Sequence, residues 1–324
     1  MDVQYVGLYR HCSPMKHSTA DRSVEEPQLA RHSPTLHTRT DEDSPDSPLP
    51  MRFPSTKAKS MSSPNYSAPA AACAAGLLLS LARASQPLSM RALAEATGTT
   101  KSLVFRVTKE LEAVGYVRDD GTGCYQLGIS ALELGGAYIS QSDYTSVARD
   151  VLQELSHDTG ETVSLAALRG SDVLYLEKWE GTHSVVTISH VGRRLPANCA
   201  ALGKALLAML DDEEVSRLHQ GELPTLTLHS IATPEELLKD LAATRQRGYA
   251  IEKNEVLVGR ACIATALDPS LVGPDLLQNN AVSISMPIHR FESDDLADLV
   301  EQLIRARSQI NANWKTRGLF QPRR

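Results

Sequence analysis

Cysteine is scarce in this chain, and no two cysteines lie close together. The five residues are Cys12, Cys73, Cys124, Cys199 and Cys262. This spacing excludes a CxxC metal site and a small disulfide framework. The chain is therefore expected to keep its thiols free in a reducing cytoplasm.

The chain also lacks a long apolar run. The longest, residues 68–82, contains Pro69, Gly76 and Ser80 and is too short to span a bilayer. The N-terminus lacks the basic start and apolar core of a signal peptide. No membrane partner is predicted, and the expected location is the cytoplasm.

Positive charge is not in excess either. The 324 residues include 33 Lys and Arg against 39 Asp and Glu, for a formal net charge of -6. Such a chain is not a basic coat for nucleic acid, although a DNA footprint can be local. Residues 70–130 hold six Lys or Arg and five Asp or Glu, so any DNA contact depends on where a few cations lie.

Residues 1–66 have the composition of a polar tail. They hold eight of the 17 prolines, many Ser and Thr, and no long apolar run. Because such a segment buries too little apolar surface to offset the entropy of ordering, a disordered tail is predicted. Its irregularly spaced histidines, His11, His17, His32 and His37, favour a polar tail over a metal site. No metal or cofactor is predicted for the chain.

Two short helices, over residues 90–97 and 100–114, are predicted with a turn at Gly98 between them. Ser89 and Thr99 are the expected N-caps. The second helix has an apolar stripe for packing, made by Val104, Val107, Leu111 and Val114. This is the helix-turn-helix arrangement, in which the second helix enters the major groove of DNA.

A small hairpin follows, with strands over residues 116–118 and 124–127 around a turn at 119–123. A hairpin directly after a recognition helix is a wing. Arg118 in this wing can reach the DNA backbone or the minor groove, or stay solvated.

The remaining chain alternates helices and strands. Helices are expected over residues 70–84, within 127–141, from Ser142 or Asp143 to Gly160, and over 201–210, 234–248 and 293–314. Strands are expected over residues 162–168, 173–179, 184–191, 262–267 and 281–288, with loops at 192–198 and 268–280. Interleaved antiparallel strands and helices indicate an α+β sensor-like domain.

Several motifs, in order along both halves of the chain, resemble those of IclR-type bacterial transcription regulators. In the first half they are Lys101-Ser102, Arg106, Leu111, Gly115-Tyr116 and Tyr125-Gln126-Leu127-Gly128. In the second half they are Gly192-Arg193-Arg194-Leu195-Pro196, Gly203-Lys204-Ala205, Arg247-Gly248-Tyr249, Cys262-Ile263-Ala264 and Ser283-Ile284-Ser285. The resemblance covers about residues 70–315.

The resemblance implies an α+β chain with an N-terminal winged helix-turn-helix, a linker helix and a C-terminal GAF-like or profilin-like effector-binding domain. The expected divisions are a tail at 1–66, the DNA-binding domain at 67–129, the linker at 130–142, the effector-binding and oligomerisation domain at 143–317 and a tail at 318–324. It also implies a non-enzymatic homodimer, often paired into a dimer of dimers. Its partners are operator DNA and a small organic acid.

The residues expected to contact DNA are Thr100, Lys101, Ser102, Phe105, Arg106, Lys109 and Arg118. Lys101 and Lys109 would neutralise phosphates. Arg106 can bind guanine through two hydrogen bonds, and Ser102 can bond a phosphate or a base edge. Phe105 replaces the polar residue usual in the family. It can contact a thymine methyl group or pack against a neighbouring protein surface.

The resemblance places Ala201, Leu202, Glu252, Cys262, Ser283 and Ser285 around the effector. Ala201 and Leu202 would offer backbone N–H groups at a helix start, which favours an anion. Ser283 and Ser285 lie two apart on one strand and so face the same side. The run from residue 198 to 202 departs from the family pattern, which leaves the ligand unidentified.

Glu252 stands where related acid binders often have Asp. A carboxylate facing a carboxylate ligand would repel it unless Glu252 pairs with a ligand hydroxyl or holds a proton, so a hydroxy- or oxo-acid is expected. Cys262 can contact the ligand or be a small buried hydrophobic residue.

Three functions follow from these patterns. The first is a ligand-responsive transcription regulator. The second is an enzyme with Cys262 as nucleophile, which would need a base such as His229, His289 or Glu252. The third is a sensor or assembly module that has lost DNA binding, an idea suggested by the weak positive charge and by Phe105.

Overall fold

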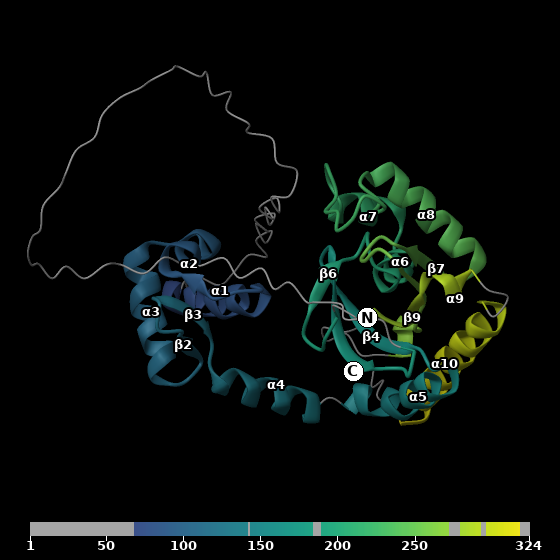
Figure 1. Cartoon of the computed structure of the whole chain (residues 1–324), viewed down its shortest axis with the longest axis horizontal. Coiled ribbons are helices and arrows are strands. Elements are labelled where there is room, and N and C mark those ends of the chain that lie inside the picture. Colours follow the sequence, from purple (N-terminus) through teal and green to yellow (C-terminus); the bar gives the residue numbers. More distant parts are fainter. Residues whose placement is uncertain (1–67, 142, 184–188, 272–278, 293–295, 318–324) are drawn as a thin grey trace, which may run out of the picture.

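The computed structural model describes two bodies joined by a helix, α4 (Figure 1). The described residues are 68–141, 143–183, 189–271, 279–292 and 296–317. The expected tails at 1–66 and 318–324 lie outside them, as do residues 184–188 of the strand expected over 184–191.

The first body contains three helices and a small antiparallel sheet. The helices are α1 (Pro69–Arg83), α2 (Met90–Thr97) and α3 (Lys101–Ala113), and the strands are β1 (Leu88–Ser89), β2 (Val117–Asp119) and β3 (Cys124–Leu127). The strand order is β1-β3-β2, so the predicted wing is confirmed and gains a third strand that the sequence did not reveal. Leu77, Leu93 and Val104 form its buried centre.

The cap of α3 differs from the prediction by one residue. Thr100, not Thr99, is the N-cap, and its hydroxyl accepts a hydrogen bond from the N–H of Leu103 at 3.4 Å. The Thr99 hydroxyl lies instead 3.1 Å from that of Thr97. Ser89 caps α2 as predicted. Two adjacent threonines offer the same cap chemistry, so the pattern alone did not choose between them.

The connecting helix α4 (Ile129–Gln141) is confirmed. None of its residues is buried. Apolar side chains on it are therefore exposed, and the largest are Ile129, Leu132, Leu134, Tyr138 and Ile139.

The second body is built on a six-stranded antiparallel sheet of order β6-β5-β4-β9-β8-β7. Its strands are β4 (Thr162–Arg169), β5 (Asp172–Trp179), β6 (Arg194–Pro196), β7 (Ala250–Lys253), β8 (Arg260–Ala266) and β9 (Asn280–Pro287). The predicted hairpin β4–β5 and the two late strands are confirmed.

Helices cover both faces of this sheet (Figure 1). On one face lie α5 (Asp143–Thr159) and α10 (Leu296–Arg317), which pack against each other. On the other lies α6 (Ala201–Leu207), with α7 (Asp212–Leu218) and α8 (Pro234–Arg247) beyond it. A turn of 3-10 helix (Pro269–Leu271) and the short α9 (Ile288–Phe291) complete the described elements. The sheet therefore separates two apolar cores.

The strand predicted over residues 184–191 is described only at its end. Residues 189–191 are not in a strand, residues 184–188 lie outside the described residues, and one edge of the sheet is β6, within the loop predicted at 192–198. β6 has three residues and ends in Pro196, as suits an edge position, and such a strand is too short to show a hydrophobic period. β7 and α7 were also not predicted, and α6 ends at Leu207 rather than at residue 210.

Gly203 lets α6 approach the segment before it. A Cβ atom at this position would clash with the backbone of Ala197, including its carbonyl oxygen. Because backbone atoms cannot move aside like a flexible side chain, only glycine fits here. The glycine of the Gly203-Lys204 motif is therefore required for steric reasons.

We expect Gly203→Ala to lower the free energy of unfolding by about 1–3 kcal/mol or more, because the added methyl group forces α6 away from Ala197. Urea denaturation measures this change. Gly136→Ala in α4 is the matched control, since a Cβ atom there meets nothing within 4 Å. It should leave stability unchanged or raise it by up to about 1 kcal/mol. Equal effects of the two substitutions would contradict the packing argument.

Candidate nucleic-acid interface and effector site

The outer face of α3 presents the cationic residues predicted to meet DNA. Lys101, Ser102 and Arg106 are exposed, while the opposite face of the helix packs on α1 and α2. The Phe105 side chain is also on the outer face, at 51% exposure. This exposure fits contact with a thymine methyl group and also packing against another protein.

Two of the predicted DNA contacts have partners within the chain. The Lys109 ammonium lies 2.7 Å from a carboxylate oxygen of Glu112 and 5.6 Å from the centre of the Tyr125 ring. Thr100 uses its hydroxyl to cap α3. Arg118 is exposed on β2. An exposed pair such as Lys109 with Glu112 contributes little energy, so a phosphate can still compete for the lysine.

The predicted effector residues meet on the sheet face that α6 covers. Glu252 on β7 lies opposite Cys262 on β8, Cys262 lies opposite Ser285 on β9, and Ser285 lies opposite Thr162 on β4. Neighbouring strands are about 4.8 Å apart, so these four residues form a row of about 14 Å. Ser283 faces the same side, two residues from Ser285. The structure thus brings four of the predicted residues together and adds Thr162.

Ala201 and Leu202 begin α6 and are both buried. The helix contacts β7, β8 and β9, so its start lies over the same side of the sheet. The N-cap, Ala200, makes no side-chain hydrogen bond. The first turn therefore receives no capping oxygen from its own N-cap residue, as a backbone anion site would require.

Glu252 makes more hydrogen bonds within the chain than the sequence suggested. Its side chain is fully buried, and one carboxylate oxygen accepts hydrogen bonds from the N–H groups of Glu255 at 2.8 Å and Val256 at 3.2 Å. The other oxygen accepts one from the Arg260 guanidinium at 3.3 Å. Three donors compensate its negative charge, so the expected repulsion of a carboxylate ligand is reduced.

Arg260 is a site residue that the sequence did not reveal. Its side chain is 3% exposed and shares the α6 side of β8 with Cys262, two residues on. Burial alone would lower the pKa of the guanidinium, but Cys262, Glu252 and Tyr175 around it raise the pKa. Burial likewise raises the pKa of Tyr175 to about 12. The predicted strand began at Cys262, so the inward-facing arginine just before it was not considered.

Cys262 does not have the properties of a nucleophile. Burial raises the pKa of its thiol to about 12, with Arg260 opposing the rise and Glu252 adding to it. A reactive cysteine needs a depressed pKa and access to solvent. Of the bases considered, His229 and His289 are exposed, and Glu252 is held by its three donors. The enzyme hypothesis finds no support at this site.

Comparison with known proteins identifies both halves of the chain. The family described as "Bacterial transcriptional regulator IclR C-terminal" matches residues 136–312, and the family described as "IclR helix-turn-helix domain" matches residues 71–121. The first match alone spans more than half of the chain. The chain belongs to the IclR family of bacterial transcription regulators.

Individual IclR-family relatives agree. The HTH-type transcriptional regulator XynR of Escherichia coli is 32% identical over 224 residues, which are 68% of this chain and 86% of the relative. A crystal structure of an IclR regulator from Alicyclobacillus acidocaldarius has a TM-score of 0.64 at 26% identity and covers 77% of this chain and all of that one. An IclR homolog from Microbacterium hydrocarbonoxydans, solved with 4-hydroxybenzoate, has a TM-score of 0.59 at 21% identity and covers 76% of this chain and 99% of that one. It supports the fold alone.

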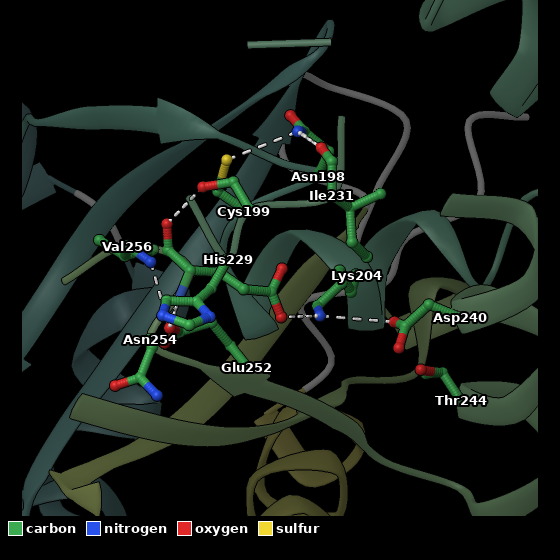
Figure 2. Close-up of polar contacts among 12 residues, drawn as sticks. Asn198, Cys199, Lys204, His229, Ile231, Asp240, Thr244, Glu252, Asn254 and Val256 are labelled. Atoms are coloured by element: carbon green, nitrogen blue, oxygen red, sulfur yellow. Dashed lines mark hydrogen bonds and ion pairs between the residues drawn. The ribbon is translucent and has the colours of Figure 1, made fainter. Parts of the chain in front are cut away.

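In this IclR-family chain, the lysine of the Gly-Lys motif, Lys204, forms ion pairs inside the protein. The Lys204 side chain is 1% exposed, and its ammonium lies 2.7 Å from Glu255 and 3.5 Å from Asp240 (Figure 2). Asp240 belongs to α8, and Glu255 follows β7. Lys204 thus connects α6 to the same turn whose N–H groups bind Glu252.

The departure from the IclR pattern at residues 198–202 also has a structural role. The Asn198 side-chain amide donates hydrogen bonds to the carbonyl oxygens of Pro224 at 2.8 Å and Ile231 at 2.9 Å. Figure 2 shows Asn198 directed at Ile231. Burial raises the pKa of the neighbouring Cys199 to about 11, so this thiol is neutral. Asn198 and Cys199 therefore hold the loop between α7 and α8 through Pro224 and Ile231.

Among the described residues, no group of three or more His, Cys, Asp or Glu is arranged to hold a metal ion. No helix within them is both long and apolar enough to cross a bilayer.

The buried Glu255 predicts a pH dependence of stability. Burial raises its pKa from 4.5 to about 7, with Lys204 opposing the rise. Between these two values the folded chain binds a proton that the unfolded chain has released. The free energy of unfolding contributed by Glu255 therefore falls as pH rises from about 4.5 to 7.

Glu255→Gln removes this titration, so its free energy of unfolding should decline less across that window than that of the unaltered chain. Thermal or urea denaturation at half-unit pH steps measures the difference. Glu235→Gln, at an exposed position of α8, is the control and should keep the original slope. Parallel curves for Glu255→Gln and the unaltered chain would show that Glu255 does not titrate in this range.

Proposed function

We propose that a small hydroxy-, oxo- or aromatic acid, bound between α6 and the sheet, modulates operator binding by α3. The observation that carries this proposal is the row of Glu252, Cys262, Ser285 and Thr162 on the α6 side of the sheet, in which all but the half-buried Ser285 are buried. Burying a polar group is costly unless it is paired, and the Thr162 hydroxyl has no partner among the described residues, so this row suits a ligand site. The Microbacterium homolog, which shares this fold, was solved with 4-hydroxybenzoate, an acid of the proposed class.

The proposed effector residues are Ala201, Leu202, Glu252, Cys262, Ser283 and Ser285. The proposed DNA contacts are Thr100, Lys101, Ser102, Phe105, Arg106, Lys109 and Arg118. Within the first set, the backbone of α6 and the hydroxyl groups of β9 are suited to hydrogen bonds with the acid. Within the second, Arg106 is suited to read guanine, and the lysines are suited to phosphates. The chain would act in the cytoplasm, where the operator lies.

Two copies of the chain would bind together. Helix-turn-helix dimers place one recognition helix on each of two half-sites. The exposed apolar residues of α4 support such a dimer, because contiguous apolar surface of this kind marks interaction sites. Ile129, Leu132 and Ile139 fall on one side of the helix by their spacing, and Leu134 and Tyr138 fall on another. The proposed domain limits, 67–129 and 143–317, put α4 between the two functions.

Operator binding is tested on DNA flanking the chain's own gene, by fluorescence anisotropy at several salt concentrations. Arg106→Ala should weaken specific binding by about 10- to 100-fold, because it removes a contact worth about 1–3 kcal/mol. Small acids added to the unaltered chain should change its DNA affinity.

Lys239→Ala is the control for a lost surface cation, since Lys239 is exposed on α8 in the other body. It should bind DNA like the unaltered chain. Unchanged affinity of Arg106→Ala would contradict the assignment of α3, and the absence of salt-sensitive specific binding would favour the sensor module without DNA binding.

Leu132→Glu tests the dimer. A charge at this exposed α4 position should raise the dimer dissociation constant by about 10-fold or more, measured by light scattering after size-exclusion chromatography. Leu228→Glu is the matched control, because Leu228 is a fully exposed leucine outside α4. If both variants dimerise like the unaltered chain, α4 is not the interface.

A further inference from the structure

We propose that Arg260 binds the carboxylate of the effector and makes the site selective for acids, with Glu252 acting as the residue that positions it. This inference rests on the proposed effector function and assigns the charge-recognising group within that site. The ligand class it specifies is a small monocarboxylate with a second oxygen, either oxo or hydroxyl, near the acid group.

The burial of Arg260 is the first observation. Its side chain is 3% exposed, and its Nε has no hydrogen-bond partner among the described residues. A buried donor without a partner is costly, and more so when it is charged. Such a group suits a site where a ligand supplies the missing acceptor.

The pairing of Arg260 with Glu252 is incomplete. Their single hydrogen bond is 3.3 Å long, whereas charge-assisted contacts between guanidinium and carboxylate groups are typically about 2.7–2.9 Å and often double. The guanidinium has five N–H donors in a planar fork. Glu252 therefore compensates part of the charge and leaves donors for a second carboxylate.

Glu252 is poorly placed to contact the ligand itself. Its other oxygen accepts the N–H groups of Glu255 and Val256, which fixes the carboxylate to the turn after β7. A ligand hydroxyl would have to displace one of these donors or share the oxygen facing Arg260. The arrangement suits a residue that orients the guanidinium.

The neighbours of Arg260 supply contacts for the second oxygen. Cys262 lies two residues along β8 on the same side, with Ser285 opposite it on β9. Thr162 continues the row, and its buried hydroxyl has no partner among the described residues. A carboxylate on Arg260 would thus place an adjacent oxo or hydroxyl group toward Ser285 and Thr162. Both hydroxyls can donate to an oxo group and accept from a hydroxyl.

The test compares acids with their uncharged amides. The probes are pyruvate, lactate and 4-hydroxybenzoate, with pyruvamide, lactamide and 4-hydroxybenzamide as matched neutral molecules, each at millimolar concentration. Thermal shift and calorimetry on the full-length chain should detect at least one acid, and its amide should bind at least 10-fold more weakly. The proposal is overturned if no acid binds or if an amide binds as well as its acid.

Three variants separate the roles of the two residues. Glu252→Gln keeps an acceptor for the two N–H groups but removes the competing charge, so it should bind the acid more tightly. Glu252→Gln combined with Arg260→Gln removes both buried charges together and should bind about 10- to 100-fold more weakly. Arg260→Lys keeps the charge and should restore part of the affinity relative to the double variant.

Two results with these variants would contradict the role assigned to Arg260. Acid binding that survives in the double variant shows that Arg260 is not the anion contact. Acid binding lost in Glu252→Gln alone shows that Glu252, not Arg260, meets the ligand. Operator binding by the unaltered chain, measured with and without the acids, is a separate experiment. Its absence under both conditions overturns the proposed function, whereas its presence with an acid-indifferent site overturns only the role of Arg260.

Discussion

The second body depends on the ion pairs made by the buried Lys204 ammonium. It joins α6 to Glu255 at 2.7 Å and to Asp240 of α8 at 3.5 Å. A buried charge is tolerated only with partners, and losing one partner leaves the others uncompensated. Because the N–H of Glu255 also donates to Glu252, the turn that anchors Lys204 fixes the carboxylate beside Arg260. The packing of α6 and the polarity of the effector site are therefore set by one connected group of charges.

The DNA-binding body also depends on a few well-placed charges. The chain carries a net charge of -6, so long-range attraction to DNA is weak. The cations of α3 are few but well placed: Lys101 and Arg106 project from the exposed side of the helix, whose other side is buried in a small core. DNA binding by such a helix would gain its energy from a few contacts at the right place, so the placement of α3 would matter more than its total charge.

Much of this architecture was predictable, and the failures have physical causes. Ser89 and Gly98 act locally through capping and left-handed backbone, so α2 was predicted at its true limits. The family motifs then pointed to candidate effector residues, four of which the structure brings together on the α6 side of the sheet. Arg260 was missed because the predicted strand began at Cys262, and because its contact with Glu252 joins residues on two strands that no local pattern brings together. β6 was missed because three residues are too few to show an alternating hydrophobic pattern. Only its pairing with β5 identifies it as a strand.

Under the proposed function, the link between the effector site and the DNA-binding helix would depend on more than one chain. α4 has 13 residues, none of them buried, and includes Gly135 and Gly136. A helix of this length without tertiary packing is marginal in water, and each glycine lowers its stability further. An isolated α4 would therefore transmit little of a change at the sheet to α3. In the proposed dimer, packing of α4 against its partner would make it rigid. Effector binding, self-association and DNA spacing would then be coupled, so that each changes the free energy of the others.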